Sequence, residues 1–148
     1  MSPRIIAALF AALAPAMRAG AAEPGAVPLA EVPAEIVVKP AGALAKGRPY
    51  QGTPSSVVTA SGQKLFVAWY GNGVDENYDN YVMVATGDAR TLRFGDLKLV
   101  IRSPHLGKVR CYDPAVWRDA SGRVYISWCQ NAEGHRPRGT WCIYTDNP

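Results

Sequence analysis

Short apolar stretches alternate with turn residues along most of the chain, a pattern that predicts β-strands. The clearest strand is Lys64 to Tyr70, where apolar side chains fall on both faces, as is typical of a strand buried on both sides. Ser55 to Thr59 precedes it across a turn in which Gly62 can take a positive φ. Tyr81 to Thr86 follows a long polar loop, and Leu97 to Arg102 is a candidate outer strand. None of these segments has a helical period, so we predict an all-β fold.

The same pattern returns 60 residues later. The recurring landmarks are Pro54 with Pro114, Ser61-Gly62 with Ser121-Gly122, Trp69 with Trp128 after a slip of one residue, and Tyr81 to Val84 with Trp141 to Tyr144. The second unit then has expected strands at Ala115 to Arg118, Arg123 to Cys129 and Thr140 to Thr145. A repeat of this length indicates an array of similar structural units.

Two such units predict neighbouring blades of a β-propeller, in which antiparallel four-stranded sheets surround a channel. A β-sandwich with a chance repeat is the alternative. Residues 49–148 hold about two blades, whereas propellers have about four to eight, so we expect the N-terminal piece of a longer propeller. Two blades alone would leave sheet edges unpaired, so we expect this piece by itself to be poorly soluble and catalytically inactive.

The N-terminal residues predict export. Arg4 precedes the apolar stretch Ile5 to Met17, and Ala19-Gly20-Ala21 offers the small-x-small pattern of a cleavage site. Residues 1–22 are therefore expected to be a signal peptide, because the apolar stretch is short for a membrane anchor, the alternative. We expect a secreted or periplasmic protein with no membrane contact after cleavage. Residues 23–48 read as a linker with one short strand at Glu35 to Lys39, which could complete a sheet built elsewhere.

Charge and composition narrow the classes of partner. The chain has 16 Lys and Arg against 12 Asp and Glu, a formal net charge of +4, and no run of basic residues. Removal of Arg4 and Arg18 with the signal leaves 4 − 2 = +2. This small surplus argues against a nucleic-acid partner. An apolar content of 48% also excludes a disordered chain.

Four stretches carry a family likeness: Tyr50 to Ser55, Trp69 to Thr86, Tyr112 to Arg123 and Trp141 to Pro148. They look, in order, like an opening Phe/Tyr-Arg-Ile-Pro motif, a first-blade loop and third strand, an Asp-Pro strand with a Gly-Arg turn, and a strand that enters an Asp-box turn. In this order they resemble the sialidase superfamily of secreted β-propeller glycoside hydrolases, including its BNR or Asp-box-like relatives. The resemblance implies a propeller of about six or seven blades.

The resemblance also implies where a sugar would bind. Gln51 or Gly52 stands where the family has the arginine that grips the sialic acid carboxylate, and Asn72 stands near the place of a second arginine. None of the three can form a bidentate charge-assisted pair with a carboxylate. The Asp-box consensus survives only as Asp88, with Phe94 near the place of the usual Trp. The resemblance therefore implies a sialidase-like exo-glycosidase that is not strictly specific for sialic acid.

The polar loop Gly71 to Asn80 holds the candidate catalytic residues. It contains Asp75, Glu76 and Asp79, and neighbouring carboxylates raise one another's pKa, as a proton donor to a glycosidic oxygen requires. By the resemblance, Asp75 stands at the place of the acid/base aspartate, with Glu76 as the alternate. A solvated acidic loop and a calcium site built from the same three carboxylates are the alternatives, and no other cofactor is expected.

Three further polar residues could contribute to a site. Asp113 opens an innermost strand and either meets a sugar hydroxyl or caps a turn. Arg110 could bind an acidic sugar, or it could be an ordinary surface arginine. His105 could act as the base of a lyase, but neither it nor His135 has a partner at a spacing suited to a metal.

Export permits disulfides, and the chain has three cysteines. Cys129 and Cys142 lie on strands joined by one loop and could face each other across a hairpin, which would leave Cys111 free.

The sequence thus supports three hypotheses that share a carbohydrate partner. The favoured one is a secreted glycoside hydrolase of the sialidase-like propeller type, with Asp75 as acid/base and Gln51, Asn72, Arg110 and Asp113 lining the pocket. The second is a non-catalytic propeller that binds glycans or proteins, and the third is a polysaccharide lyase on the same fold. Released monosaccharide would distinguish the first, and a 4,5-unsaturated uronate the third.

Overall fold

A computed structural model describes residues 28–45, 49–134 and 139–148 of the chain. Within these residues the protein is all-β, with two antiparallel sheets and two short 3₁₀ helices, η1 and η2. The elements are η1 Leu29–Glu31, β1 Glu35–Val38, η2 Gly42–Ala45, β2 Gln51–Val58, β3 Lys64–Gly71, β4 Tyr81–Asp88, β5 Phe94–Arg102, β6 Val109–Arg118, β7 Val124–Ala132 and β8 Thr140–Thr145. The expected signal peptide, residues 1–22, lies outside the described residues.

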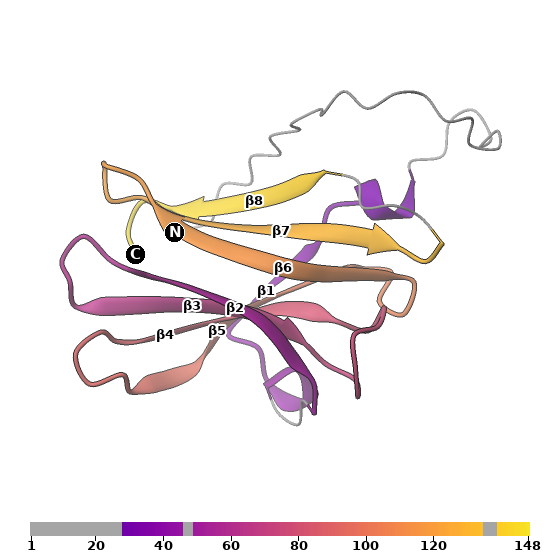
Figure 1. The fold of residues 1–148 in the computed structure, drawn as a ribbon, viewed down its shortest axis with the longest axis horizontal. Helices are drawn as coiled ribbons and strands as arrows, with labels where there is room; N and C mark the ends of the chain where they lie inside the picture. Colours follow the sequence, from indigo (N-terminus) through magenta and orange to yellow (C-terminus); the bar gives the residue numbers. More distant parts are fainter. Residues whose placement is uncertain (1–27, 46–48, 135–138) are drawn as a thin grey trace.

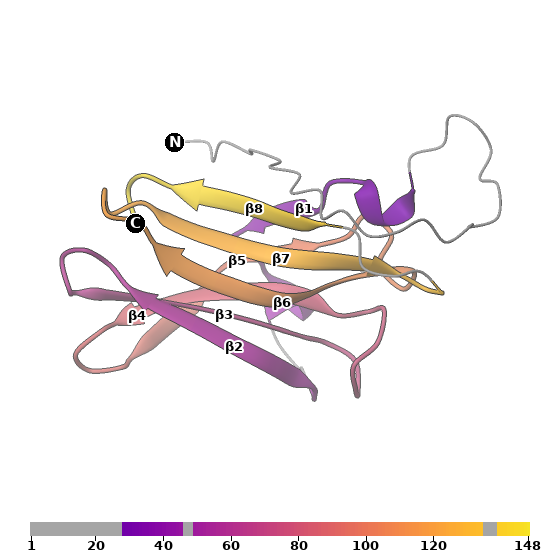
Figure 2. The ribbon, with the colours of Figure 1, turned by 45° about the horizontal axis from the view of Figure 1, so that its top comes forward.

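The first sheet has the strand order β1-β5-β4-β3-β2, and the second has the order β6-β7-β8. They lie one over the other (Figures 1 and 2). The prediction that Ser55 to Thr59, Lys64 to Tyr70 and Tyr81 to Thr86 share one antiparallel sheet is confirmed. The candidate outer strand is part of β5, and the short strand expected within residues 23–48 is β1, which pairs with β5.

The internal repeat is visible in the backbone of the two hairpins β2–β3 and β6–β7. The strand register breaks between Gly52 and Ser55 in the first hairpin, and between Tyr112 and Ala115 in the second. Inside these two bulges, Thr53 has φ 42° and Asp113 has φ 46°, a left-handed conformation that few residues with a Cβ adopt. The two bulges are 60 residues apart, so the repeat extends to an unusual backbone feature.

The alignment of the third strands of the two units was wrong by two residues. Trp128 takes the place of Trp69, but Trp69 lies opposite Met83, whereas Trp128 lies opposite Trp141. The counterpart of Met83 is therefore Trp141, at an offset of 58, and not Ile143, at an offset of 60. A shift of two residues keeps every side chain on the same face of the sheet, so an apolar pattern cannot reveal it.

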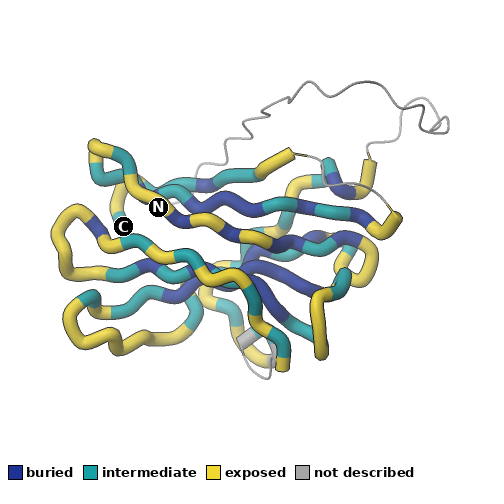
Figure 3. The backbone as a smooth tube through the Cα atoms, in the orientation of Figure 1, coloured by how far each residue is buried: buried dark blue, intermediate teal, exposed yellow. Residues whose placement is uncertain are grey.

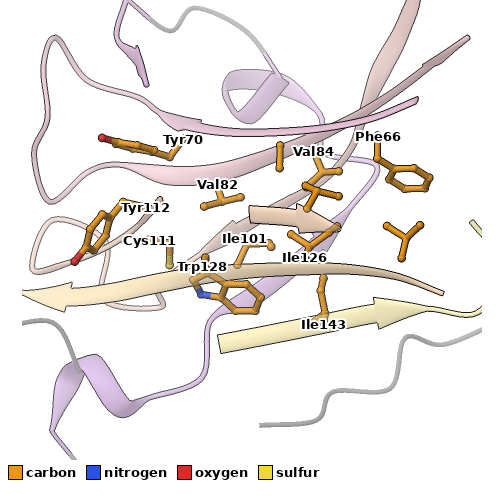
Figure 4. Packing of buried hydrophobic residues seen from close by; sticks show 13 residues of the cluster. Phe66, Tyr70, Val82, Val84, Ile101, Cys111, Tyr112, Ile126, Trp128 and Ile143 are labelled. Atoms are coloured by element: carbon orange, nitrogen blue, oxygen red, sulfur yellow. The ribbon is translucent and has the colours of Figure 1, made fainter. Parts of the chain in front are cut away.

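The hydrophobic core lies between the two sheets (Figure 3). Val82 and Ile101 from the first sheet are fully buried, as are Cys111 and Val124 from the second. In Figure 4 the labelled side chains of the cluster, among them Val82 and Ile101, form a row along the strands, with Tyr70 and Tyr112 at one end of it. Packing at this interface fixes the relation between the sheets and buries both of those tyrosines.

The first strands of the two units, β2 and β6, also contact each other directly. The backbone N–H of Val116 donates to Oγ of Ser55 over 2.9 Å, and Nε of Arg118 donates to the carbonyl oxygen of Val58 over 3.2 Å. These contacts keep the two bulges in neighbouring strands.

No helix in the described part of the chain is long and apolar enough to cross a membrane.

A buried amide ties the N-terminal segment to the second sheet. Nε2 of Gln130 donates to the carbonyl oxygens of Ala30, at 2.8 Å, and Val32, at 3.0 Å. The Gln130→Ala change should lower the free energy of unfolding by about 1–3 kcal/mol, because both carbonyls lose a buried donor. Urea denaturation followed by circular dichroism measures this, with the exposed Glu133→Gln as control. Equal stability of the two variants would contradict it.

Candidate functional site

The candidate site lies at one end of the two sheets, where β2 and β6 begin. The loop from residue 72 to 80 and the turn from residue 103 to 108 meet there through backbone hydrogen bonds. The N–H of Gly107 donates to the carbonyl oxygen of Tyr78 over 3.0 Å, and the N–H of Cys111 donates to that of Asn80 over 3.1 Å. The long polar loop is therefore docked against the start of β6.

Asn80 holds this loop in shape from its centre. Its side chain is fully buried, and Nδ2 donates to the carbonyl oxygens of Asn72, at 2.6 Å, and Asp75, at 3.2 Å. Its Oδ1 accepts from the backbone N–H of Asn77 at 2.9 Å. Asn favours such turns because its side chain bonds nearby backbone groups. Asn and Gly both tolerate a positive φ, which Asn72 and Gly73 adopt.

Five side chains form what we call the tyrosine–arginine cluster: Tyr50, Tyr70, Tyr112, Glu76 and Arg110. Oε1 of Glu76 accepts from Nη1 of Arg110 at 2.6 Å and from the hydroxyl of Tyr70 at 3.3 Å. The Arg110 guanidinium lies over the ring of Tyr112, 4.2 Å from its centre. The hydroxyl oxygens of Tyr50 and Tyr70 are 3.4 Å apart. The cluster thus joins one cation, one anion and three aromatic rings from both sheets.

The two ends of the ion pair differ in exposure. The Arg110 side chain is 17% exposed, while that of Glu76 is 48% exposed. Nε of Arg110 is buried and has no hydrogen-bond partner in the structure. The carboxylate therefore faces solvent at the rim, and the guanidinium is held beneath it by the aromatic rings.

Both inner tyrosines of the cluster keep their protons. Burial, followed by the hydrogen bond with Tyr50, raises the pKa of Tyr70 well above its ordinary value. Burial is also the main cause that raises the pKa of Tyr112. At neutral pH both hydroxyls are therefore neutral hydrogen-bond donors, and neither is a phenolate nucleophile.

The structure brings only part of the expected site together. Glu76 and Arg110 lie in the tyrosine–arginine cluster. Asp75 is exposed on the same loop, where Oδ1 accepts from Nδ2 of Asn77 at 3.0 Å. The Asn72 side chain is tied to its own loop, because its Nδ2 donates to the carbonyl oxygen of Asp79 at 2.9 Å. Asp113 is exposed within the β6 bulge, close to the cluster member Tyr112 in the chain.

Gln51 follows Tyr50 in the chain, but it borders a different hollow. A cleft of about 1140 Å³ lies on the side of the first sheet that faces away from the second. Gln51, Trp69, Phe94 and Lys98 are among its lining residues. His105 lies in the turn before β6 and is partly buried, with its backbone N–H bonded to Oγ of Ser103.

Tyr50 and Tyr112 belong to the cluster, although neither was predicted from the sequence as a site residue. The repeat places a glycine in the first unit, Gly52, where the second unit has Tyr112, 60 residues later. A Cβ at position 52 would lie 2.9 Å from the hydroxyl of Tyr50 and 3.1 Å from the ring of Tyr70. Glycine at this point therefore leaves the space that the two tyrosine side chains fill.

In the part of the chain that the structure describes, there is neither a group of metal ligands nor a disulfide. Across residues 28–45, 49–134 and 139–148, no three His, Cys, Asp or Glu side chains gather as metal ligands would. Cys111, Cys129 and Cys142 are all free thiols. Cys129 lies opposite Thr140, and Cys142 lies opposite Ser127, so these two cysteines are diagonal neighbours rather than a facing pair.

Comparison with known proteins finds no matching protein family, no matching curated protein and no matching solved structure.

Proposed function

We propose that the two sheets are neighbouring blades of a sialidase-like β-propeller, and that the protein is a secreted carbohydrate-active enzyme of the exo-glycosidase type. The observation that carries this proposal is the tyrosine–arginine cluster, formed where the first strands of both units begin. Of its rings, Tyr70 and Tyr112 are buried, so the partly exposed Tyr50 is the one that can meet a sugar. An aromatic ring beside charged groups that bond hydroxyls is a combination suited to glycans. The repeated bulge at Thr53 and Asp113 supports the reading of the sheets as copies of one unit.

In this proposal Asp75 gives a proton to the leaving glycosidic oxygen. Its exposure on a loop anchored by Asn80 suits a group that must reach a bound sugar, and its single side-chain bond to Asn77 is easily exchanged. Glu76 is held by Arg110 through a contact of 2.6 Å, so its carboxylate is less free than that of Asp75 to reach a leaving group. Arg110 and the partly exposed Tyr50 contact the sugar, and the buried rings of Tyr70 and Tyr112 support them from below.

The test is an assay of purified protein on sialosides, rhamnosides and uronic-acid glycans, for the 148-residue chain and for any longer product of the same reading frame. We expect glycan binding by both and released monosaccharide only from a product with more blades. An unsaturated uronate would instead identify a lyase. Absence of both cleavage and glycan binding in every product would overturn the proposal.

A non-catalytic glycan-binding propeller is the second candidate, since the Glu76 carboxylate is already neutralised by Arg110. Retained binding without any product in the assay would favour it over the hydrolase.

Arg110 gives a test of glycan binding that does not depend on turnover. The Arg110→Met change should weaken glycan affinity about tenfold or more, because the cation is lost while the aliphatic stem is kept. Glycan arrays or calorimetry measure it. The matched control is Arg102→Met, which removes the Arg102–Glu35 ion pair (2.9 Å) at the far edge of the first sheet. Equal affinity of the two variants would exclude Arg110 from the site.

A further inference from the structure

The cation of the tyrosine–arginine cluster already has an anionic partner within the protein. Nη1 of Arg110 donates to Oε1 of Glu76 over 2.6 Å, and the hydroxyl of Tyr70 donates to the same oxygen over 3.3 Å. The Arg110 side chain is mostly buried and lies over the ring of Tyr112, whereas the Glu76 side chain stands at the rim. A ligand that approaches Arg110 from solvent therefore meets the carboxylate of Glu76 first.

The charged groups around this ion pair are mostly carboxylates. In the described segments 49–53, 72–80 and 103–113, the two basic residues are Lys108 and Arg110, and the four acidic residues, all exposed, are Asp75, Glu76, Asp79 and Asp113. The cation of Arg110 is already paired, which leaves Lys108 against the acidic surplus. A carboxylate on a ligand would add a further negative charge to this region, and like charges brought together across an interface are costly.

A ligand carboxylate would also have to compete with Glu76 itself. Glu76 belongs to a loop that the buried Asn80 anchors through hydrogen bonds to the backbone of Asn72 and Asn77. A group tethered in this way has a high effective concentration at its partner. A dissolved carboxylate at lower concentration displaces such a group poorly, because it only replaces one ion pair by another.

A neutral sugar hydroxyl meets no such competition. Both hydrogen bonds of the Glu76 side chain in the described part of the chain use Oε1, which leaves Oε2 open on a side chain that is 48% exposed. A hydroxyl is both a donor and an acceptor, so it can donate to Oε2 and leave the ion pair intact. An ionised carboxylate can only accept, so it has no bond to offer to Glu76.

We propose that Glu76 is the specificity-determining residue of the tyrosine–arginine cluster, and that it makes this cluster select neutral, hydroxyl-bearing sugars over sugars that carry a carboxylate. Arg110 holds Glu76 in place, and Oε2 of Glu76 accepts a hydrogen bond from the sugar. Uronic and sialic acids are then poor ligands for this position. The inference deepens the proposed function and rests on it, because it concerns the same glycan site.

The test compares glycans that differ in one carboxylate. Matched pairs of hexose and hexuronic acid glycans are titrated into the 148-residue chain by calorimetry, and the ratio of the two affinities is measured. Wild-type protein should favour the neutral member about tenfold or more. Glu76→Gln should shift the ratio about tenfold toward the acidic member, because Arg110 then lacks its balancing charge. Asp79→Asn, the matched control on the same loop, should shift it by less than about threefold.

Acetate gives a second measurement that needs no glycan. The ¹⁵N chemical shift of the Arg110 guanidinium is followed by NMR while sodium acetate is added, with sodium chloride at equal ionic strength as the control. We expect a saturable change in Glu76→Gln, and none in wild-type protein at the same acetate concentration. Circular dichroism confirms that both proteins are folded.

The outcomes separate this inference from the proposed function. A wild-type preference for the acidic glycans, or equal shifts of the ratio in Glu76→Gln and Asp79→Asn, would overturn the role of Glu76 and leave glycan binding intact. So would an equal response of wild-type protein and Glu76→Gln to acetate. If neither member of any pair binds, the proposed glycan function fails and this specificity fails with it.

Discussion

Asp75→Asn should lower the turnover of a glycan-cleaving form of the protein by about 10²- to 10⁴-fold, the usual weight of general acid catalysis. The amide is close in size to the carboxylic acid but cannot donate the required proton. Folding should change little, because the Asp75 side chain is exposed and its one side-chain hydrogen bond, accepted from Nδ2 of Asn77, also lies in solvent. The measurement is kcat on the best substrate found in the glycan assay.

Asp79→Asn is the matched control, since it removes the same charge from the same loop. Its turnover should stay within about threefold of wild type, because the exposed charge of Asp79 affects the reaction only through electrostatic interactions that salt and water screen. A Glu76→Gln variant separates the two candidate acids. If Asp75→Asn keeps full turnover while Glu76→Gln loses it, Glu76 is the acid and the role given to Asp75 is wrong.

Trp128→Ala should produce the largest loss of stability of any single change considered, about 3–5 kcal/mol. The Trp128 side chain is 2% exposed and belongs to the core cluster between the two sheets (Figure 4). Its indole Nε1 is buried and makes no hydrogen bond in the structure, so the loss is one of packing. A whole domain is stable by only about 5–15 kcal/mol, so the variant should be partly unfolded near 37 °C.

Urea denaturation compares this variant with Trp128→Phe, which keeps an aromatic ring and should lose roughly half as much stability. Trp117→Ala is the exposed counterpart on the outer face of the same sheet, 42% exposed, and should cost about 1 kcal/mol or less. Similar losses for Trp128→Ala and Trp117→Ala would mean that the sheets do not pack as described.

Much of the fold could be predicted because the decisive signals are local. An apolar run such as Lys64 to Tyr70 and a turn with a positive-φ glycine, at Gly62 or Gly122, act within one hairpin. The offset of 60 residues then predicted the second hairpin from the first. The register of β8 was missed because pairing depends on loop length, and the pattern is identical after a shift of two residues.

The candidate site was harder to predict from the sequence than the fold, because its residues are brought together by contacts between distant segments. Asp75, Glu76 and Arg110 could be chosen by residue type, but which of them meet depends on how the loop from residue 72 to 80 docks on β6. That docking depends on the buried amide of Asn80, which sequence alone cannot distinguish from a solvated asparagine. The tyrosine–arginine cluster is assembled from both sheets, and no local pattern encodes such a meeting.

The pairing of β1 with β5 has a consequence for synthesis on the ribosome. Glu35 and Arg102 are joined across 67 residues of chain, so β1 cannot enter its sheet until β5 has been made. At roughly 5–20 residues per second this takes about 3–13 s. The segment just ahead of β1 waits longer still, because Ala30 and Val32 accept their hydrogen bonds from Gln130, about 100 residues further along the chain.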